Sequence, residues 1–239
     1  DKPSWYLLFD SSHNKVRETK YFYDNKEYGS IAKGELTKTE SWLDTGGGNP
    51  TARYMYDSFG NLIEQVDPLG RVTKYEYGLT DTTFTYPERV TNPLGHKTDF
   101  AYDIYGNVVS ETKNGITKTF TYDVFGRISK EIMPYDDADF PTKSYTYSFD
   151  GIAPEFEIIK QRTTSNNTIN VYYYYDGFGN LVQIKSPADN GQQVVKNLFY
   201  DGLFRVKEEQ NPFFNYFNIN LSSLTNLSNK TRYNYDALS

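Results

Sequence analysis

Apolar and polar residues alternate along most of this chain in short runs, and clusters of Asp, Asn, Pro and Gly separate the runs. In the run Ile116–Tyr122, every second residue is Ile, Lys, Phe or Tyr, and the residues between them are threonines. The runs Arg71–Tyr77 and His96–Tyr102 alternate in the same way. A period of two predicts β-strands. Each strand then has an aromatic face and a polar face, as in an antiparallel sheet with one solvated side.

Several of these strands end in a turn with the sequence motif Tyr-Asp-x-x-Gly. An Asp that opens a four-residue turn caps it with its side chain, and Gly in fourth place accepts the left-handed conformation that leads into the next strand. The pattern therefore predicts a type I turn closing a hairpin. Its copies consist of Tyr56, Asp57 and Gly60; Tyr102, Asp103 and Gly106; Tyr122, Asp123 and Gly126; and Tyr175, Asp176 and Gly179.

A second kind of turn closes the far end of the hairpins. Asp67-Pro68-Leu69-Gly70 and Asn92-Pro93-Leu94-Gly95 place Pro second and Gly fourth, which is also typical of turns. Asn114-Gly115 fits a two-residue hairpin turn between the predicted strands 107–113 and 116–122. Two strands and two turns thus make one repeat of about 20 residues.

The pattern aromatic-x-Tyr marks the repeats along the chain. Its intervals range from 20 residues, between Tyr102 and Tyr122, to 35 residues, between Tyr200 and Tyr235. Such regular spacing predicts an all-β fold of repeated antiparallel hairpins in a curved ribbon, closed or curled so that its edges are protected. The marking tyrosines are Tyr23, Tyr56, Tyr77, Tyr102, Tyr122, Tyr147, Tyr175, Tyr200 and Tyr235, with Leu198 in the first position at Tyr200.

The repeats are expected to form one region over residues 1–239, interrupted by long insertions at about 134–141, 150–168 and 211–230. Two late turns lack the final Gly, namely residues 201–204 and 236–239. The chain lacks an initiator Met and ends within the last turn, so we expect a fragment of a longer chain. We find no signal peptide and no apolar run of the roughly 20 residues that a membrane helix needs.

Composition removes several classes of function. The 239 residues carry 25 Lys and Arg against 31 Asp and Glu, a net charge of −6, with the basic residues scattered. This argues against a nucleic-acid partner and against a polybasic membrane patch. Together with the absence of a long apolar run, it leads us to expect no membrane insertion. The absence of Cys excludes disulfides and thiolate metal sites. The 23 Tyr, 16 Phe and 2 Trp make up 17% of the chain, so we expect an aromatic core with many polar handles.

Candidate catalytic and metal-binding residues are few, and each has a plainer interpretation. His96 follows a turn Gly and is better explained as a polar residue at a strand start than as a catalytic base. With only His13 besides it, a zinc site is improbable. Asp136, Asp137 and Asp139 offer oxygen ligands for Ca²⁺ but do not match a calcium loop. The repeated turn aspartates favour turn capping over a row of catalytic acids. We expect no enzyme activity, cofactor or metal.

The row of tyrosines admits a different function, because aromatic rings stack on sugars. Outward-facing tyrosines such as Tyr172 and Tyr174 would then bind glycans, although packing within the sheet needs the same rings. Four N-glycosylation sequons support surface exposure weakly, and they begin at Asn166, Asn220, Asn226 and Asn229.

The motifs YDSFGNLIEQVDPLGRVTKYEY and YDVFGR resemble the Rhs/YD-repeat family, which includes teneurins, Rhs toxins and the B and C components of insecticidal toxin complexes. The resemblance extends from about Lys15 to Ser239. It implies a strip of hairpins coiled into a hollow shell, which encloses a C-terminal effector in the toxins and forms part of an adhesion structure in teneurins. The aspartyl autocleavage region that ends many Rhs shells is missing, so self-cleavage and toxicity are not assigned.

Taken with the resemblance, the sequence predicts a non-enzymatic structural segment of a secreted or cell-surface protein that contributes wall to a shell around a toxin or effector. Its partners would be the rest of its parent chain or the enclosed effector, and open sheet edges would permit self-association. The alternative is an extracellular adhesion or carbohydrate-binding module. A glycosidase with paired carboxylates ranks lowest, since nothing in the sequence marks such a pair.

Overall fold

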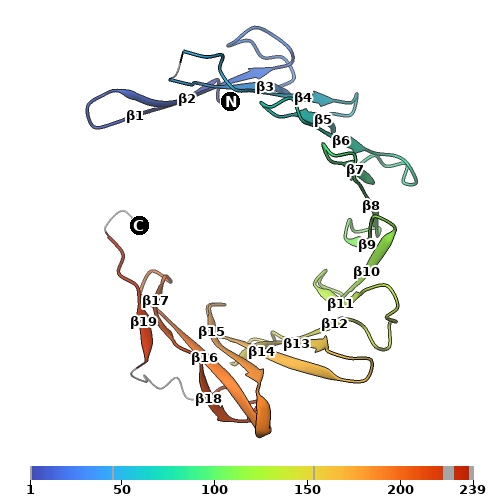
Figure 1. The fold of residues 1–239 in the computed structure, drawn as a ribbon, viewed down its shortest axis with the longest axis vertical. Helices are drawn as coiled ribbons and strands as arrows, with labels where there is room; N and C mark the ends of the chain where they lie inside the picture. Colours follow the sequence, from blue (N-terminus) through green and yellow to red (C-terminus); the bar gives the residue numbers. More distant parts are fainter. Residues whose placement is uncertain (1, 45, 153, 223–228, 237–239) are drawn as a thin grey trace. The chain divides into compact units, whose positions relative to one another are not determined.

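The computed structural model describes residues 2–44, 46–152, 154–222 and 229–236, and nearly all their regular structure is β-strand. The chain divides into two compact units. Unit 1 comprises residues 1–117, coloured blue to green in Figure 1, and unit 2 comprises residues 118–239, coloured green to red. The predicted all-β class is therefore confirmed. Within the described residues the one helical segment is the 3-10 turn Asp189–Gly191, and no helix is long and apolar enough to cross a membrane.

Unit 1 is an antiparallel meander, in which each strand pairs with the one that follows it in the chain. The chain passes into the second unit within β10 (Ile116–Tyr122). The strands of unit 1 are β1 (Trp5–Phe9), β2 (Lys15–Tyr23), β3 (Leu36–Ser41), β4 (Thr51–Tyr56), β5 (Leu62–Val66), β6 (Val72–Glu76), β7 (Arg89–Thr91), β8 (Lys97–Tyr102) and β9 (Val108–Lys113).

Unit 2 continues the meander from β10 to β16 and then divides. The first half of β16 pairs with β18, and its last residues pair with β17, which in turn pairs with β19. The strands after β10 are β11 (Ile128–Ile132), β12 (Lys143–Ser148), β13 (Glu155–Arg162), β14 (Thr168–Tyr175), β15 (Leu181–Pro187), β16 (Gln192–Tyr200), β17 (Val206–Gln210), β18 (Phe213–Tyr216) and β19 (Lys230–Arg232).

A register shift recurs where a strand ends in its repeat tyrosine. The residue before Tyr56 pairs with Glu64, but Tyr56 itself pairs with Leu62, and Tyr102 shifts in the same way to pair with Val108. Tyr122, Tyr175 and Tyr200 repeat the shift. A type I turn followed by a left-handed glycine produces this register shift, which is a β-bulge. The motif Tyr-Asp-x-x-Gly therefore sets the register of each hairpin.

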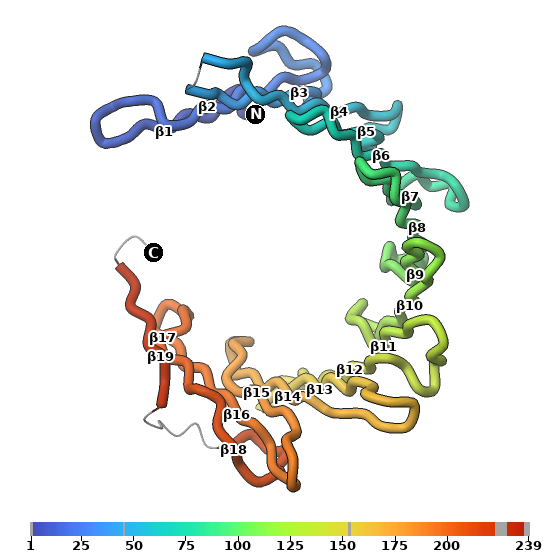
Figure 2. The backbone as a smooth tube through the Cα atoms, in the orientation of Figure 1, coloured from blue at the N-terminus to red at the C-terminus, as the bar shows by residue number. Residues whose placement is uncertain are grey.

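Two of the expected insertions contain strands. Residues 150–168 include β13, which pairs along its whole length with β14, and residues 211–230 include β18. Strand β13 does not end in aromatic-x-Tyr. Strand β18 does, at Phe214-Asn215-Tyr216, but Phe217 follows it in place of the turn Asp, and Tyr216 is not among the marking tyrosines. Conversely, the chain leaves the sheet between β6 and β7 as a loop of residues 77–88, which is visible in Figure 2 and was not predicted as an insertion.

The buried core is small and lies mainly in unit 2. Most strand residues are half-buried on both faces, and the buried apolar cluster consists of Tyr172, Tyr174 and Val182. The cluster is extended by the partly buried Phe156, Ile158, Tyr200 and Leu221. Beside it lies a set of buried polar residues, namely Gln183, Lys185, Gln193, Asn197 and Gln210.

Candidate functional site

Each Asp-x-x-Gly turn is held by the carboxylate that opens it. At the turn of Tyr102, Asp103 Oδ1 accepts the main-chain N–H groups of Tyr105 and Asn107, both at 2.9 Å. Asp103 Oδ2 accepts the Asn107 side-chain amide at 2.9 Å. The Gly106 N–H donates to the Asp103 carbonyl at 3.1 Å, and Gly106 has a φ of 85°. The corresponding bonds form at Asp57, Asp123 and Asp176, where Gly60, Gly126 and Gly179 also have positive φ.

The turns at the far ends of the hairpins use the same geometry. Asp67 Oδ1 accepts the main-chain N–H groups of Leu69 and Arg71 at 2.9 Å, and Gly70 has a φ of 78°. In the turn of Asn92, Pro93 and Gly95, the amide oxygen of Asn92 does the work of the carboxylate. It accepts the N–H groups of Leu94 and His96 at 3.0 Å. A neutral acceptor therefore suffices for this turn.

The turn without its glycine keeps the geometry at the cost of backbone strain. Asp201 Oδ1 accepts the N–H groups of Leu203 at 2.8 Å and Arg205 at 3.0 Å. Phe204 occupies the glycine position with a φ of 61°, which is an outlier for a bulky residue. Its ring lies 5.3 Å from that of Phe178 at the preceding Tyr-Asp turn. The last predicted turn, residues 236–239, lies largely outside the described residues.

The repeat tyrosines link each hairpin to an earlier part of its own unit. The Tyr77 hydroxyl donates to the Leu62 carbonyl at 3.1 Å, and the Tyr147 hydroxyl donates to the Ile128 carbonyl at 2.9 Å. The acceptor is the first strand residue after the preceding Tyr-Asp turn. Equivalent bonds join Tyr56 to Leu36, Tyr200 to Leu181 and Tyr235 to Val206, and Tyr102 donates to Pro87. Tyr175 instead donates to the Glu157 carboxylate at 3.3 Å.

Replacing Tyr77 with phenylalanine is expected to lower the free energy of unfolding by about 1 kcal/mol, because the Leu62 carbonyl loses its donor while the ring is kept. Urea unfolding followed by tyrosine fluorescence measures the change. Tyr105→Phe is the control, since that side chain is 82% exposed and should change stability by less than about 0.5 kcal/mol. Equal effects of the two substitutions would contradict the linking role of the Tyr77 hydroxyl.

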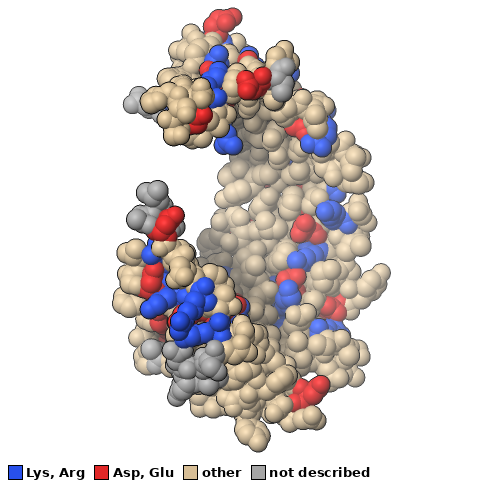
Figure 3. Space-filling view, turned by 60° about the vertical axis from the view of Figure 1, so that its left-hand side comes forward, with Lys and Arg blue, Asp and Glu red and all other residues tan. Residues whose placement is uncertain are grey.

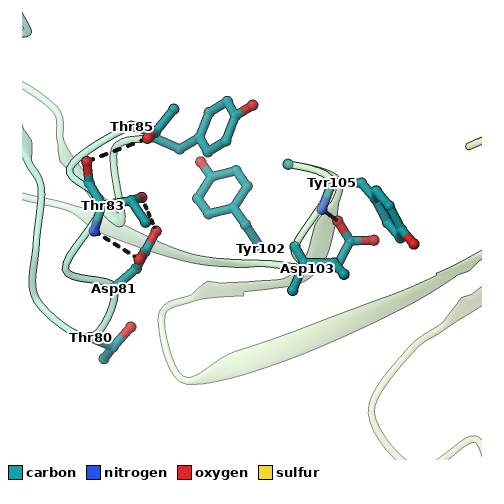
Figure 4. Close-up of a pocket in the computed structure, with 10 residues that line it drawn as sticks. Thr80, Asp81, Thr83, Thr85, Tyr102, Asp103 and Tyr105 are labelled. Atoms are coloured by element: carbon teal, nitrogen blue, oxygen red, sulfur yellow. Dashed lines mark hydrogen bonds between the residues drawn. The ribbon is translucent and has the colours of Figure 1, made fainter.

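A pocket of about 620 Å³ lies in unit 1 beside the turn of Tyr102 and Asp103. Figure 4 shows the loop of residues 77–88 on one side, the Asp103–Tyr105 turn on the other, and the Tyr102 ring between them. The Tyr86 and Tyr102 rings stack with centroids 4.9 Å apart. The lining residues are Thr80, Asp81, Thr83, Thr85, Tyr86, Tyr102, Asp103, Ile104, Tyr105 and Gly106.

The loop over this pocket is shaped by a buried carboxylate that sequence reasoning missed. Glu88 is 4% exposed, and it accepts the N–H and hydroxyl of Thr80 at 2.6 Å and the Asp81 N–H at 2.8 Å. Asp81 in turn holds Thr83, and the hydrogen bond from the Thr83 hydroxyl is the main reason that the pKa of Asp81 lies below its ordinary value. Both carboxylates therefore serve the shape of the pocket.

Adding a side chain at Gly106 is expected to be more costly than at the equivalent far-end glycine. Gly106→Ala places a methyl group against the Tyr86 side chain, whereas the same change at Gly70 meets open space. Both residues have positive φ, so each substitution costs about 1–2 kcal/mol in backbone strain. At Gly106 the contact between the new methyl group and Tyr86 destabilises the folded state further. Thermal unfolding of the two variants compares them, and a melting temperature for Gly106→Ala at or above that of Gly70→Ala would refute this packing.

The tyrosines singled out for glycan stacking are not available. Tyr172 is 9% exposed and Tyr174 is 1% exposed, so that expectation is corrected. Alternation along β14 tells which tyrosines share a face but not which face is covered. Exposed rings are found at the Tyr-Asp-x-x-Gly turns instead, among them Phe59, Tyr105, Phe125 and Phe178.

The aspartates of the 134–141 insertion have local partners. Asp136 pairs with Arg162 and accepts the Thr142 hydroxyl at 2.5 Å, and Asp137 caps the N–H groups of Asp139 and Phe140. Among the described residues no group of three or more His, Cys, Asp and Glu is placed to hold a metal ion. His96 is exposed at the start of β8, with its Nδ1 3.4 Å from the Asn92 amide.

Charged side chains gather on one face of unit 2, around β17 and β19. Figure 3 shows Lys and Arg with acidic residues among them in this region. Lys196 pairs with Glu209 at 2.6 Å, and Lys230 and Arg232 pair with Glu208 at 2.7 and 3.0 Å. Because the basic groups have acidic partners, this face offers little net positive charge to a polyanion.

Comparison with known proteins gives one matched repeat and a similar fold. Residues 56–83 match the model of the RHS repeat, and no curated protein matches. A structure of the Photorhabdus luminescens Tc holotoxin pore, with a substituted TccC3 component, is 14% identical, with a TM-score of 0.53 over 88% of this chain. A crystal structure of TcdB2-TccC3-TEV is 18% identical over 86% of this chain with a TM-score of 0.46.

This chain spans only a small part of those proteins, 13% of the matched chain in both structures. At such low identity the likeness to the holotoxin pore concerns the fold alone. The matched segment 56–83 begins at the first Tyr-Asp-x-x-Gly turn and includes the far-end turn of Asp67, so it spans one whole hairpin repeat of the kind described above. Residues 56–83 thus contain one RHS repeat, the kind of repeat found in the YD-repeat proteins that the sequence resembles.

Proposed function

We propose that this chain is a non-enzymatic wall segment of a secreted or cell-surface protein, and that it forms part of a β-shell around a toxin or effector. The observation that carries the proposal is the tyrosine bond between repeats. Because the hydroxyl of one repeat reaches the first strand residue after the preceding turn, neighbouring hairpins are fastened side by side. Bonds of this kind recur along both units, as expected for hairpins that pack side by side in a wall.

The acidic residues support a structural role over catalysis. A catalytic acid or base must have an oxygen free to reach its substrate. In the turns, Asp103 accepts three hydrogen bonds from its own loop, and Asp67 accepts three as well. Their oxygens are occupied in holding the chain, which supports turn capping as the reason that these residues recur.

The enclosing role is supported by the RHS repeat at residues 56–83 and by the similar fold of a chain in a toxin-complex structure. An extracellular location is part of the proposal and is supported by the same comparison. The partner would be an effector or another part of a longer parent chain. Self-association through sheet edges stays a prediction.

The test is limited proteolysis of the full-length parent protein, with the fragments identified by mass spectrometry. We expect the enclosed segment to be cut slowly in the native protein. Cleavage should accelerate by roughly tenfold or more when the wall is weakened by Tyr77→Phe, Tyr147→Phe and Tyr200→Phe together, because each lost bond costs about 1 kcal/mol. Tyr105→Phe serves as the control. Equal cleavage rates in the native and triple-substituted proteins would argue against an enclosing wall.

A second candidate function is saccharide binding at the pocket beside Tyr102. The pocket combines an exposed Tyr105 ring with threonine hydroxyls and two aspartates, a composition suited to polar ligands that also stack on aromatic rings. A glycan array with the chain and its Tyr105→Ala variant tests it. Phe125→Ala is the matched control, because Phe125 occupies the same turn position and is 79% exposed. An array without binding, or equal losses in both variants, would exclude this function.

A further inference from the structure

A five-residue segment of unit 2, Asn218–Ser222, crosses the buried polar face of β15, and we call it the strap. Lys185 on β15 holds it at two points, because its ammonium group donates to the Asn218 carbonyl at 3.0 Å and to the Asn220 carbonyl at 2.5 Å. Both acceptors are main-chain atoms. The bond thus depends on the path of the strap and not on its side chains.

The other contacts between the sheet and the strap also reach its main chain. Gln183 on β15 forms a reciprocal pair, in which its Nε2 donates to the Ser222 carbonyl at 3.3 Å and its Oε1 accepts the Ser222 N–H at 3.0 Å. Gln193 Oε1 on β16 accepts the Asn218 N–H at 3.2 Å, and the Tyr174 hydroxyl on β14 donates to the Ile219 carbonyl. Side chains from three strands therefore form a polar surface that contacts the main chain of the strap, and we call this surface the groove.

The side chains of the strap contribute little to its attachment. Ile219 is 56% exposed, and Phe217 and Tyr216 just before the strap are 53% and 83% exposed. Leu221 is the exception, since it packs against the cluster of Tyr172, Tyr174 and Val182. A segment with other side chains and the same backbone path would make most of the same bonds.

The floor of the groove is preorganised across the strands. Gln183 lies opposite Tyr174 on one side and opposite Asn197 on the other. Gln183 Nε2 donates to Asn197 Oδ1 at 2.7 Å, and Asn197 Nδ2 donates to Gln210 Oε1 at 2.6 Å. This row of amides fixes the orientation of Gln183, which is itself fully buried.

The groove and the row of amides beside it contain hydrogen-bond donors that the strap does not satisfy. Within the described part of the chain, the buried amide nitrogens of Gln193 and Gln210 have no partner, although both residues are 1% exposed. Lys185 is 0% exposed and forms none of the ion pairs found among the described residues. Unpaired buried donors cost free energy, and native proteins rarely keep them without a reason. Burial also lowers the pKa of Lys185, as expected for a cation that lacks an anionic partner.

We propose that this face of β14, β15 and β16 is a binding groove for a polypeptide segment read through its main chain, and that the strap occupies the groove in cis. A segment of another polypeptide could displace the strap. Its main-chain carbonyl groups would then accept hydrogen bonds from Lys185, Gln183 and Tyr174. The proposal adds a peptide-binding site to the wall and does not depend on whether the wall encloses an effector.

The experiment uses residues 1–239, with a fluorescent peptide of the sequence Phe-Asn-Ile-Asn-Leu-Ser copied from residues 217–222, and measures binding by fluorescence anisotropy. In the native chain the tethered strap competes at an effective concentration of about 1 mM, so binding should be weak. Asn218→Pro removes the N–H that Gln193 accepts and weakens the strap. We expect this variant to bind the peptide about tenfold more tightly than the native chain, a difference of about 1.4 kcal/mol.

Peptide variants show whether the groove recognises the main chain of the peptide or its side chains. A scrambled peptide should bind within about threefold of the original, whereas N-methylation at the positions of Asn218 and Ser222 should weaken binding by about tenfold, since two main-chain donors are lost. Lys185→Met in the Asn218→Pro chain should weaken binding by a similar factor.

Two results would overturn the proposal. One is the absence of peptide binding to Asn218→Pro and also to Ser222→Pro, which releases the opposite end of the strap, in chains whose circular dichroism retains the native sheet signal. The other is binding that survives N-methylation but is lost on scrambling, because the groove would then recognise side chains.

Discussion

Replacing Tyr174 with alanine is expected to lower the free energy of unfolding of unit 2 by about 3–5 kcal/mol, the range for removing a large buried aromatic side chain. Tyr174 is 1% exposed, and its ring lies 6.4 Å from Tyr172 and 6.1 Å from Phe156. Its hydroxyl also anchors the strap at Ile219. Chemical unfolding followed by circular dichroism measures the loss.

Tyr173→Ala is the matched control, because Tyr173 is the next residue of β14, has its side chain on the opposite face and is only half-buried. We expect its effect to be less than half that of Tyr174→Ala. Tyr174→Phe isolates the hydroxyl and should cost about 1 kcal/mol. A small effect at Tyr174 together with a large one at Tyr173 would mean that the opposite face of β14 is the buried one.

Acidification is expected to destabilise both units, because the turn aspartates hold the hairpins in their ionised form. The pKa of Asp67 and of Asp201 lies below the ordinary 3.8 chiefly because the main-chain N–H four residues later donates to the carboxylate. For Asp103 the main cause is the Asn107 side chain. At Asp57 and Asp123 partial burial raises the pKa, but the turn hydrogen bonds outweigh it and leave the pKa lowered.

The sign follows from proton binding. Each lowered pKa means that the folded state binds fewer protons than the unfolded state near pH 3.8, so the contribution to stability is present above that pH. The contribution is lost as the pH falls through the lower pKa of the folded state. We therefore expect the urea midpoint to be nearly constant from pH 7 to 5 and to fall steeply between pH 4 and 2.

Asparagine at the turn positions provides the control for acidification, since Asn92 already holds its turn with a neutral oxygen. A chain with Asp57, Asp67, Asp103 and Asp123 changed to Asn should lose less stability on acidification than the native chain. An unchanged midpoint of the native chain down to pH 3, or the same acid sensitivity in both chains, would show that these carboxylates are not responsible.

The hairpins could be predicted because their information is local. An Asp, a Gly three residues later and alternating residues on either side specify a turn and its flanking strands within about ten residues. The bulge at Tyr102 and the two-residue turn at Asn114-Gly115 follow from such short sequence motifs. Asn114 and Gly115 both have positive φ, as that turn requires. These features do not depend on what the rest of the chain does.

The site features that sequence reasoning missed depend on distant partners. Gln183 accepts a hydrogen bond from the main-chain N–H of Ser222, which is 39 residues away, and no local sequence pattern predicts this contact. Tyr172 and Tyr174 were expected to face outward because alternation does not reveal that residues 218–222 cover them. No sequence motif marks Glu88, yet it is buried and accepts three hydrogen bonds from Thr80 and Asp81.

The central claim, that these repeats form the wall of a shell, is tested most directly by a cryo-electron microscopy reconstruction of the full-length parent protein. We expect a continuous wall in which hairpins lie side by side in chain order and which surrounds enclosed density. In that wall, repeat tyrosines such as Tyr77 and Tyr147 should reach the first strand residue after the preceding turn. A reconstruction in which the hairpins are solvated on both faces and enclose nothing would contradict it.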